Sequence, residues 1–304
     1  MPLPEQIKPG DVVLSRGTEA LSRAICLMDD SEVSHAALAV GEEGLAEVTG
    51  KGLHTLSFAR AQEGHDLVVG RTLAAPADMT PVLDVARRYL DAGRTSYAYQ
   101  QIVLLAVLCV TRRVPLPPGG RLLARTALDR AAAALNAMAE MGRQPMICSE
   151  FVYRCHYEAI PGDPYVLKTD GGGVRGAAEG QSLLDWAEAH PALPRVQALP
   201  KTGPFDPAAT EAAVAPLVSA CTAAAGRLPL GGHLPTDPDD EELLASMAAF
   251  GRALHGGPLP AGQALEAIRA KEAEPNFVTP GDLLRSLSLK ETLRLGHASR
   301  GGLF

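Results

Sequence analysis

The sequence predicts an α+β protein in which an antiparallel sheet packs against helices, with an additional helical segment rich in alanine and proline. Three observations lead to this fold class. Short apolar runs separated by glycine-containing turns fill the N-terminal third, a pattern typical of hairpins. Apolar residues at helical spacing follow from Thr80. Proline-rich breaks then alternate with alanine-rich stretches over residues 196–275.

The sheet is expected from a meander of short strands. A Pro-Gly turn precedes the first strand, a helix is expected over residues 18–28, and Gly41-Glu-Glu-Gly44 supplies a turn between the next two strands. The strand candidates are apolar runs bounded by turn signals: residues 7–15, 34–40, 45–49, 52–58 and 66–71.

The helices are expected from apolar stripes and their end signals. Val82, Val85, Ala86, Tyr89 and Leu90 fall on one stripe. Further helices are expected over residues 99–112, over residues 122–141 and from about residue 148, and three more in the alanine-rich segment over residues 207–225, 237–254 and 261–272.

These elements suggest a catalytic domain over residues 1–195, a helical insertion or small second module over 196–275, and a tail over 276–304 that packs back on the first domain. The Leu, Val and Ala stripes of the insertion have to be buried, either against the catalytic domain or in a protein partner.

Composition excludes several classes of protein. The 304 residues carry a formal charge of −7, and no run of basic residues exceeds Arg112-Arg113, so nucleic acid is a poor partner. The longest apolar run, residues 102–110, is shorter than the roughly 20 residues that a membrane-spanning helix needs. The N-terminus lacks the features of a signal peptide. We therefore expect synthesis in the cytoplasm, with any export independent of a signal peptide.

Five cysteines without a CxxC pair argue against a disulfide framework and a zinc ribbon. Most of them are expected to be small buried hydrophobes. Cys148 differs, because it opens an apolar helix, and the unpaired N–H groups there favour a thiolate and point at a developing oxyanion from Cys148 or Ser149. His35 heads an apolar strand and is the candidate base.

These residues resemble the circularly permuted branch of the NlpC-like papain-fold cysteine hydrolases, which is related to the lecithin:retinol acyltransferases. The likeness rests on three motifs in the order of that branch: Gly10-Asp11-Val-Val-Leu14, Ser34-His35-Ala-Ala-Leu38 and Ile147-Cys148-Ser149-Glu150-Phe151-Val152. It extends to Tyr97-Ala-Tyr99 and more faintly to Thr279-Pro-Gly-Asp-Leu283. It covers about residues 8–160 and the tail.

The resemblance implies a papain-like fold, Cys148 as nucleophile and His35 as base, with Tyr97 and Tyr99 lining the substrate channel. It also implies a third polar residue that orients His35, for which Glu47 is the candidate. A two-residue turn at Glu42-Glu43 would place Glu47 opposite Leu38, on the other face from His35, so an odd-length loop or a bulge is required.

Other candidates are weaker. His54 and His65 lie on later strands and replace His35 only if the resemblance fails. His156 lies about 12 Å along the helix from Cys148, and Cys155-His156 without a second ligand pair is a poor metal site. Glu150 points away from Cys148. No cofactor or metal is expected.

The expected enzyme is a cysteine hydrolase, acting on a peptide, isopeptide or cell-wall amide, or on an acyl ester, through a Cys148 acyl-enzyme. Three alternatives stay open: a lipid acyl hydrolase or acyltransferase, a delivered toxin or effector using the same site, and a binding protein without turnover, against which the Cys148/His35 pair argues.

Overall fold

The computed structural model describes residues 4–41, 44–49, 52–74, 78–92, 100–112, 116, 118–141, 146–169, 181–196, 205–224, 236–272 and 277–296. The chain forms two compact units. The first comprises Met1–Gln100, Arg143–Gly172 and Glu274–Arg300; the second comprises Gln101–Gly142, Gly173–Ala273 and Gly301–Phe304.

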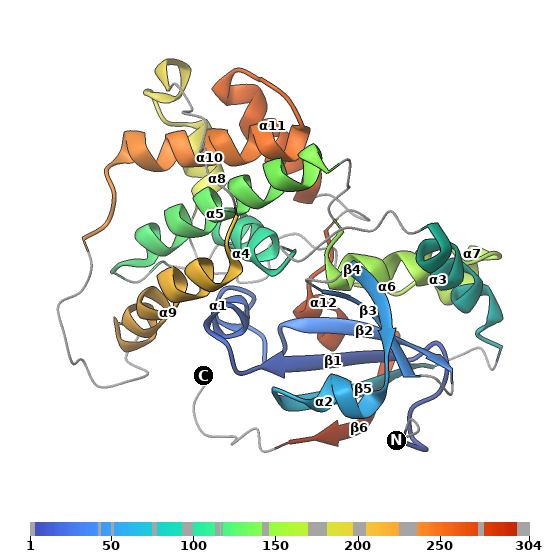
Figure 1. Ribbon diagram of the computed structural model, residues 1–304. Helices are drawn as coiled ribbons and strands as arrows, with labels where there is room; N and C mark the ends of the chain where they lie inside the picture. Colours follow the sequence, from blue (N-terminus) through green and yellow to red (C-terminus); the bar gives the residue numbers. More distant parts are fainter. Residues whose placement is uncertain are drawn as a thin grey trace. The chain divides into compact units, whose positions relative to one another are not determined.

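The first unit is built on a six-stranded sheet in which every described pair of neighbours is antiparallel. The strand order is β4-β3-β2-β1-β5-β6. β6, near the C-terminal end of the chain, lies at the edge of the sheet beyond β5 (Figure 1). The prediction of an α+β protein with an antiparallel sheet is confirmed. The strands are β1 (Val12–Gly17), β2 (His35–Gly41), β3 (Gly44–Thr49), β4 (Gly52–Leu56), β5 (His65–Leu73) and β6 (Leu289–Leu295).

The helices of the first unit are short and lie between or after the strands. The apolar stripe expected from Thr80 forms α3, and Cys148 begins α6. The helix α2 was not expected from the sequence, which assigned Phe58 to a strand. The helices are α1 (Ala20–Met28), α2 (Phe58–Gln62), α3 (Thr80–Ala92), α6 (Cys148–Tyr157), α7 (Gly162–Tyr165) and α12 (Pro280–Arg285).

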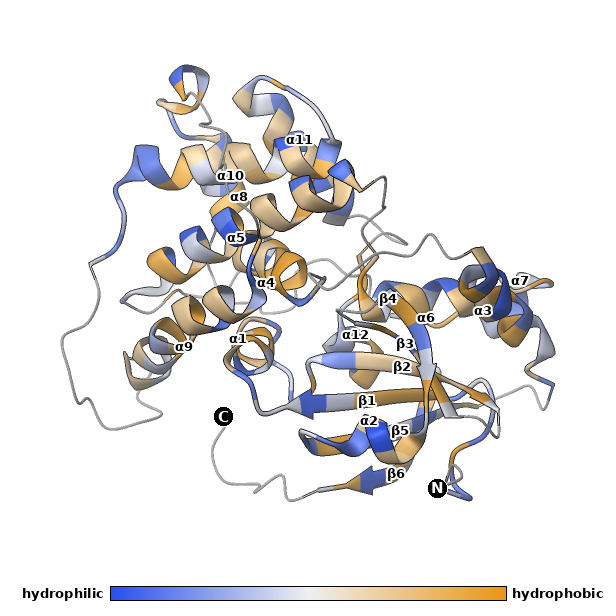
Figure 2. Cartoon of the chain, viewed as in Figure 1, coloured by the Kyte–Doolittle hydropathy of each residue, from blue (hydrophilic) through white to orange (hydrophobic). Residues whose placement is uncertain are grey.

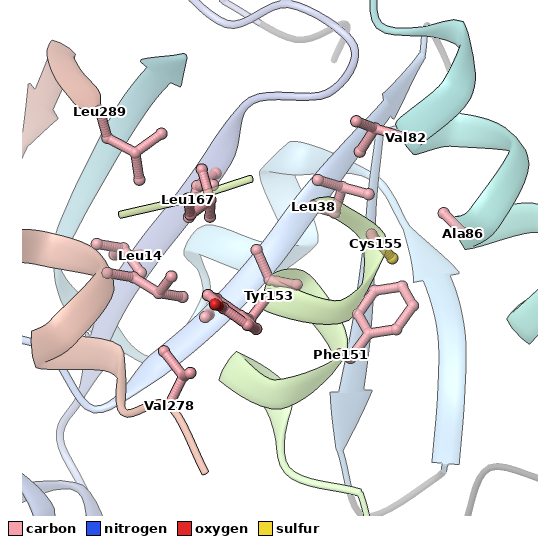
Figure 3. Packing of buried hydrophobic residues seen from close by; sticks show 14 of the residues in the cluster. Leu14, Leu38, Val82, Ala86, Phe151, Tyr153, Cys155, Leu167, Val278 and Leu289 are labelled. Carbon is pink, nitrogen blue, oxygen red and sulfur yellow. The ribbon is translucent and has the colours of Figure 1, made fainter. Parts of the chain in front are cut away.

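Both faces of the sheet are covered by apolar side chains, because successive residues of a strand point to opposite faces. β1 is hydrophobic along most of its length (Figure 2). On one face, Phe151, Tyr153 and Cys155 of α6 gather with Leu14 and Leu38 of the sheet (Figure 3). The other face has a smaller cluster, which includes Phe58 of α2. Because the two faces pack against different clusters, a shift of register by one residue would move the side chains of a strand to the wrong face.

A buried carboxylate ties the C-terminal tail to the N-terminal part of this unit. Asp29, at the end of α1, accepts hydrogen bonds from Thr279 Oγ1 and from the Gly281 N–H, both at 2.9 Å. Thr279 also caps α12, where its side chain and that of Asp282 form a capping box. The tail is thus joined to the rest of the first unit through α12 as well as through β6.

The second unit is helical in its described part. α5 packs against α9 and α10, α10 against α11, and α11 against α8. Ion pairs join these helices, among them Arg121–Asp240 and Arg269–Asp185. The elements are α4 (Gln100–Thr111), α5 (Gly120–Glu140), α8 (Leu183–Glu188), the 3-10 helix η1 (Leu193–Arg195), α9 (Pro207–Ala224), α10 (Asp240–His255) and α11 (Ala261–Glu272).

This division differs from the domain bounds expected from the sequence. Residues 101–142, which were assigned to the catalytic domain, group with 173–273. Both helices that pack against α5 have buried apolar residues, among them Val214 and Val218 of α9 and Leu243 and Leu244 of α10. The alanine-rich segment therefore belongs to the same compact unit as α5, although Cys148 and α6 lie between the two in the sequence.

Among the helices in these described ranges, none combines the length and the hydrophobicity that crossing a bilayer requires.

Candidate active site

Cys148 is the first residue of α6 and is 1% exposed. Ile147 before it has an extended backbone, so the N–H groups of the first turn have no partner within the helix. Phe151, Val152 and Cys155, which follow Cys148 on the same face of α6, anchor this helix in the core. The core contacts of α6 therefore fix where the thiol lies.

The surroundings of Cys148 favour a thiolate. Burial by itself raises the pKa of this thiol, but the charge of His35 and the backbone N–H groups of Ala36 and Ser149 outweigh it and bring the pKa below the usual range. The other four cysteines are also buried and free. Burial instead raises the pKa of Cys26 to about 12 and that of Cys221 to about 11.

His35 begins β2, in the middle of the sheet, and is 6% exposed. It lies opposite Ser15 of β1. Burial by itself lowers the pKa of its imidazole, but Cys148 and Glu47 outweigh this effect and raise that pKa well above the usual range. The ring and the thiol thus favour the charged form of each other, as a thiolate and an imidazolium do.

A β-bulge brings Glu47 to the face of His35. Near the turn, Gly41 lies opposite Gly44, and continuing this register would pair Glu47 with Leu38. The register instead shifts between Ala39 and Gly41, so that Glu47 lies opposite Ala37. Side chains two residues apart on a strand share a face. Glu47 is therefore a diagonal neighbour of His35, and the bulge required by the sequence argument is present.

Gly44 makes this tight connection possible. Its φ of 124° is unfavourable for residues with a Cβ, and a Cβ at this position would lie 2.1 Å from the carbonyl oxygen of Leu56. A glycine is required here because both the backbone conformation and the approach of β4 exclude a side chain.

The Glu47 carboxylate is hydrogen-bonded to the imidazole of His35. Its Oε2 lies 2.9 Å from Nε2 of His35. Burial by itself raises the pKa of Glu47, but the hydrogen bond and charge of His35 outweigh it, and His54 and His65 add to the lowering. An ionised carboxylate only accepts hydrogen bonds, so Nε2 carries the proton. In the neutral ring of His35, the lone pair then lies on Nδ1, which is buried and has no hydrogen-bond partner by distance among the described residues.

A cavity of about 10 Å³ adjoins His35 and Glu47 on the α2 face of the sheet. This volume is at the lower limit for a cavity that holds one water molecule. Ser15 and Gln62 supply polar groups to its wall, and Phe58 closes it from α2.

The other histidines near the site are arranged as follows. His54 lies opposite Glu47 across β3 and β4, with its Nε2 3.6 Å from Oε1 of Glu47. The His65 ring stacks on that of His35 at a centroid separation of 6.5 Å. His156 is fully buried within α6. Within the described ranges, no group of three His, Cys, Asp or Glu side chains is arranged to hold a metal ion.

The remaining predicted site residues have different positions. Ser149 is fully buried, and its backbone N–H faces the Cys148 sulfur. Glu150 pairs with Arg154 at 3.0 Å along α6. Tyr97 and Tyr99 lie outside the described residues.

Sequence reasoning missed two contributions. The N–H of Ala36 toward the sulfur carries no side-chain signal. The contact between His54 and Glu47 does have a signal in the sequence, because only Gly50-Lys51 separate Thr49 from Gly52. A two-residue hairpin connection at this point pairs residue 47 with residue 54.

The chain is similar in sequence to a protein of Escherichia coli strain K12 named probable lipoprotein peptidase YaeF. The two are 30% identical over 171 residues, which cover 54% of this chain and 60% of that protein. The chain thus spans about three fifths of the length of this curated relative.

Among solved structures, the metalloprotein yiiX from Escherichia coli O157:H7 matches with 15% identity and a TM-score of 0.33, over 55% of this chain and 72% of that one. No family model matches the chain.

Proposed function

We propose that the protein is a cysteine-dependent hydrolase of the permuted NlpC-like, papain-fold kind, with Cys148 as nucleophile, His35 as base and Glu47 as the residue that orients His35. The observation that carries the proposal is the hydrogen bond between Glu47 and His35, together with the position of Cys148 at a helix N-terminus, where the charge of His35 lowers the pKa of its thiol. Nucleophile, base and orienting acid in this relation are the parts of a catalytic triad.

In the proposed reaction, the Cys148 thiolate attacks a carbonyl carbon and forms a C–S bond. The N–H groups at the start of α6 stabilise the oxyanion. His35 then gives the proton on Nδ1 to the leaving amine or alcohol, and the C–N or C–O bond breaks. Nδ1 next takes a proton from water, whose oxygen attacks the thioester. The C–S bond breaks, which releases the acid and restores the Cys148 thiolate beside the His35 imidazolium.

A peptide-type amide is the substrate class that we favour. The supporting observation is the likeness to a protein whose name describes a lipoprotein peptidase. The same acyl-enzyme also forms from a lipid ester, so the first experiment has to compare the two classes.

The test is intact-protein mass spectrometry after incubation with matched panels of peptide, cell-wall and lipid acyl probes. We expect one covalent adduct from a peptide-type probe, lost in Cys148→Ala and retained in Cys155→Ala. The second variant is a matched control, because Cys155 lies on the same helix and burial raises its thiol pKa. An adduct that survives in Cys148→Ala contradicts the proposal, and an adduct from lipid probes alone contradicts the peptide assignment.

A further inference from the structure

The carboxylate of Glu47 lies between two imidazoles. Its Oε2 is 2.9 Å from Nε2 of His35, and its Oε1 is 3.6 Å from Nε2 of His54. The first contact is a hydrogen bond, and the second lies at ion-pair distance when the ring of His54 is protonated. Both oxygens of the carboxylate are thus engaged with histidines from the two strands that flank β3.

The position of His54 follows from the same register that positions Glu47. The two residues are direct partners in the β3–β4 ladder, so their side chains leave the same face of the sheet. Glu47 has 9% of its side chain exposed and His54 has 29%. His54 therefore lies on the solvent side of a buried carboxylate.

The ring of His54 is fixed at its other nitrogen. Nδ1 lies 2.9 Å from the carbonyl oxygen of Gly52. A carbonyl only accepts hydrogen bonds, so Nδ1 donates to it. Because Nε2 faces a carboxylate, both nitrogens of this ring face acceptors. The doubly protonated ring satisfies both, whereas the neutral ring directs a lone pair at Glu47.

The net charge of the buried groups shows why this contact is favourable. If Cys148 is a thiolate and His35 an imidazolium, the two charges cancel, and Glu47 adds one negative charge in a buried place. Such a charge is costly without a partner. The titratable groups facing Glu47 are His35 from β2, His54 from β4 and, farther along the sheet, His65 from β5. Among the residues that the structure describes, His54 is the one that pairs with the second carboxylate oxygen.

We propose that His54 is a positioning residue that holds the Glu47 carboxylate against His35 by pairing with its second oxygen. This inference rests on the proposed function. His54 does not touch the reacting atoms. It acts on Cys148 only through Glu47 and His35, so its effect on the thiol disappears when Glu47 loses its charge.

The test measures the rate of Cys148 alkylation by iodoacetamide between pH 3 and pH 9 in the full chain. In His54→Phe, the acid limb of the profile should move to higher pH by at least about 0.3 of a unit, because a Glu47 carboxylate that is no longer held at its second oxygen supports the His35 imidazolium, and through it the thiolate, less well. The matched control is His255→Gln, an exposed histidine on α10, which should leave the profile unchanged. His54→Gln serves as a second variant in case the Phe variant does not fold.

A double-mutant cycle separates positioning from a general effect of charge. In a Glu47→Gln background, adding His54→Phe should leave the acid limb within about 0.1 of a unit of its place, because the oxygen that His54 pairs with no longer carries charge. An undiminished shift in that background overturns the inference, and so does an unmoved limb in both His54 variants while His35→Gln still moves it. If His35→Gln also leaves the profile unchanged, the proposed function itself fails.

Discussion

Nε2 of His35 lies 2.9 Å from Oε2 of Glu47, and the two residues are diagonal neighbours on adjacent strands. The hydrogen bond and the negative charge of the carboxylate both raise the pKa of His35, and the imidazolium in turn lowers the pKa of Cys148. We therefore expect the reactivity of the thiol to depend on Glu47 as well as on His35.

The first prediction concerns selective labelling. Iodoacetamide should modify Cys148 faster than the other four cysteines near neutral pH, because its pKa is lowered while burial raises those of Cys26, Cys109, Cys155 and Cys221. Peptide mapping after brief exposure gives the five rates. Equal rates would be incompatible with the proposed ion pair.

The second prediction concerns the base. His35→Ala should lower the turnover rate at least about 100-fold, the scale of lost general acid–base catalysis. The measurement is steady-state kinetics with a substrate of the class whose probe labels Cys148 in the mass-spectrometry test. His65→Ala is the matched comparison, since His65 stacks on His35 without contacting Glu47 by any described hydrogen bond. A larger loss in His65→Ala than in His35→Ala would reassign the base.

The third prediction concerns Glu47→Gln. Glu47 contributes to the raised pKa of His35, so its neutral replacement should move the alkaline limb of the pH profile of turnover to lower pH. The rate at the optimum should fall by about 10-fold or more, because the ring is no longer held in one orientation. Steady-state kinetics across the pH range report both quantities. An alkaline limb that stays in place would remove Glu47 from the triad.

The fourth prediction concerns the tail. Asp29→Asn should lower the free energy of unfolding by about 1–3 kcal/mol, because one of the donors from Thr279 and Gly281 loses its charged acceptor in a buried place. Urea unfolding measures the change. The control is Asp66→Asn, whose half-exposed pair with Arg16 should contribute less than about 1 kcal/mol. Similar losses in the two variants would refute the role given to Asp29.

The fifth prediction concerns acid stability. Burial lowers the pKa of His156 to about 4, below the usual value of about 6.5 for the unfolded chain. The unfolded state therefore binds the proton more readily, and the stability contributed by the neutral ring is present above pH 6.5 and lost as the pH falls toward 4. The loss is about 3 kcal/mol.

His156→Met replaces the ring with an apolar side chain of similar size that cannot take up this proton. Its unfolding free energy should fall less steeply than that of the wild type between pH 6.5 and pH 4, while His255→Gln should follow the wild type. Parallel curves for His156→Met and the wild type would show that this ring takes no part in the pH dependence of the unfolding free energy.

The sequence predicted most strands and helices because apolar alternation and helical spacing are local signals. It anticipated that Glu47 needs a bulge to reach the face of His35, since the period of a strand is two. It missed α2, because Phe58 continues an apolar run and the cap at Ser57 is a weak signal. It also missed β6, a polar edge strand in which only Leu289, Leu293 and Leu295 repeat at even spacing.

The grouping of the helices was harder to predict for a different reason. α5 precedes Cys148 by only a few residues in the chain, yet it packs with α9 and α10 in the other unit. Such contacts depend on which apolar faces match in three dimensions, and an alanine-rich stripe does not specify its partner. The candidate residues at the site were predictable because each motif is local, whereas the pairing of His54 with Glu47 depends on the hairpin register.

The extra residue at Val40 also bears on how this gene can change in length. If Val40 is deleted, Ala39 becomes the neighbour of Gly41, and Ala37 still pairs with Glu47. The loss of a single residue from β3 between Gly44 and Glu47 would instead place Glu47 opposite Leu38 and turn it toward the larger apolar cluster. Insertions at the tip of the hairpin leave the register intact. Among descendants of this sequence, the β2–β3 hairpin should therefore tolerate added residues at its tip, or the loss of Val40, more readily than the loss of one residue from the start of β3.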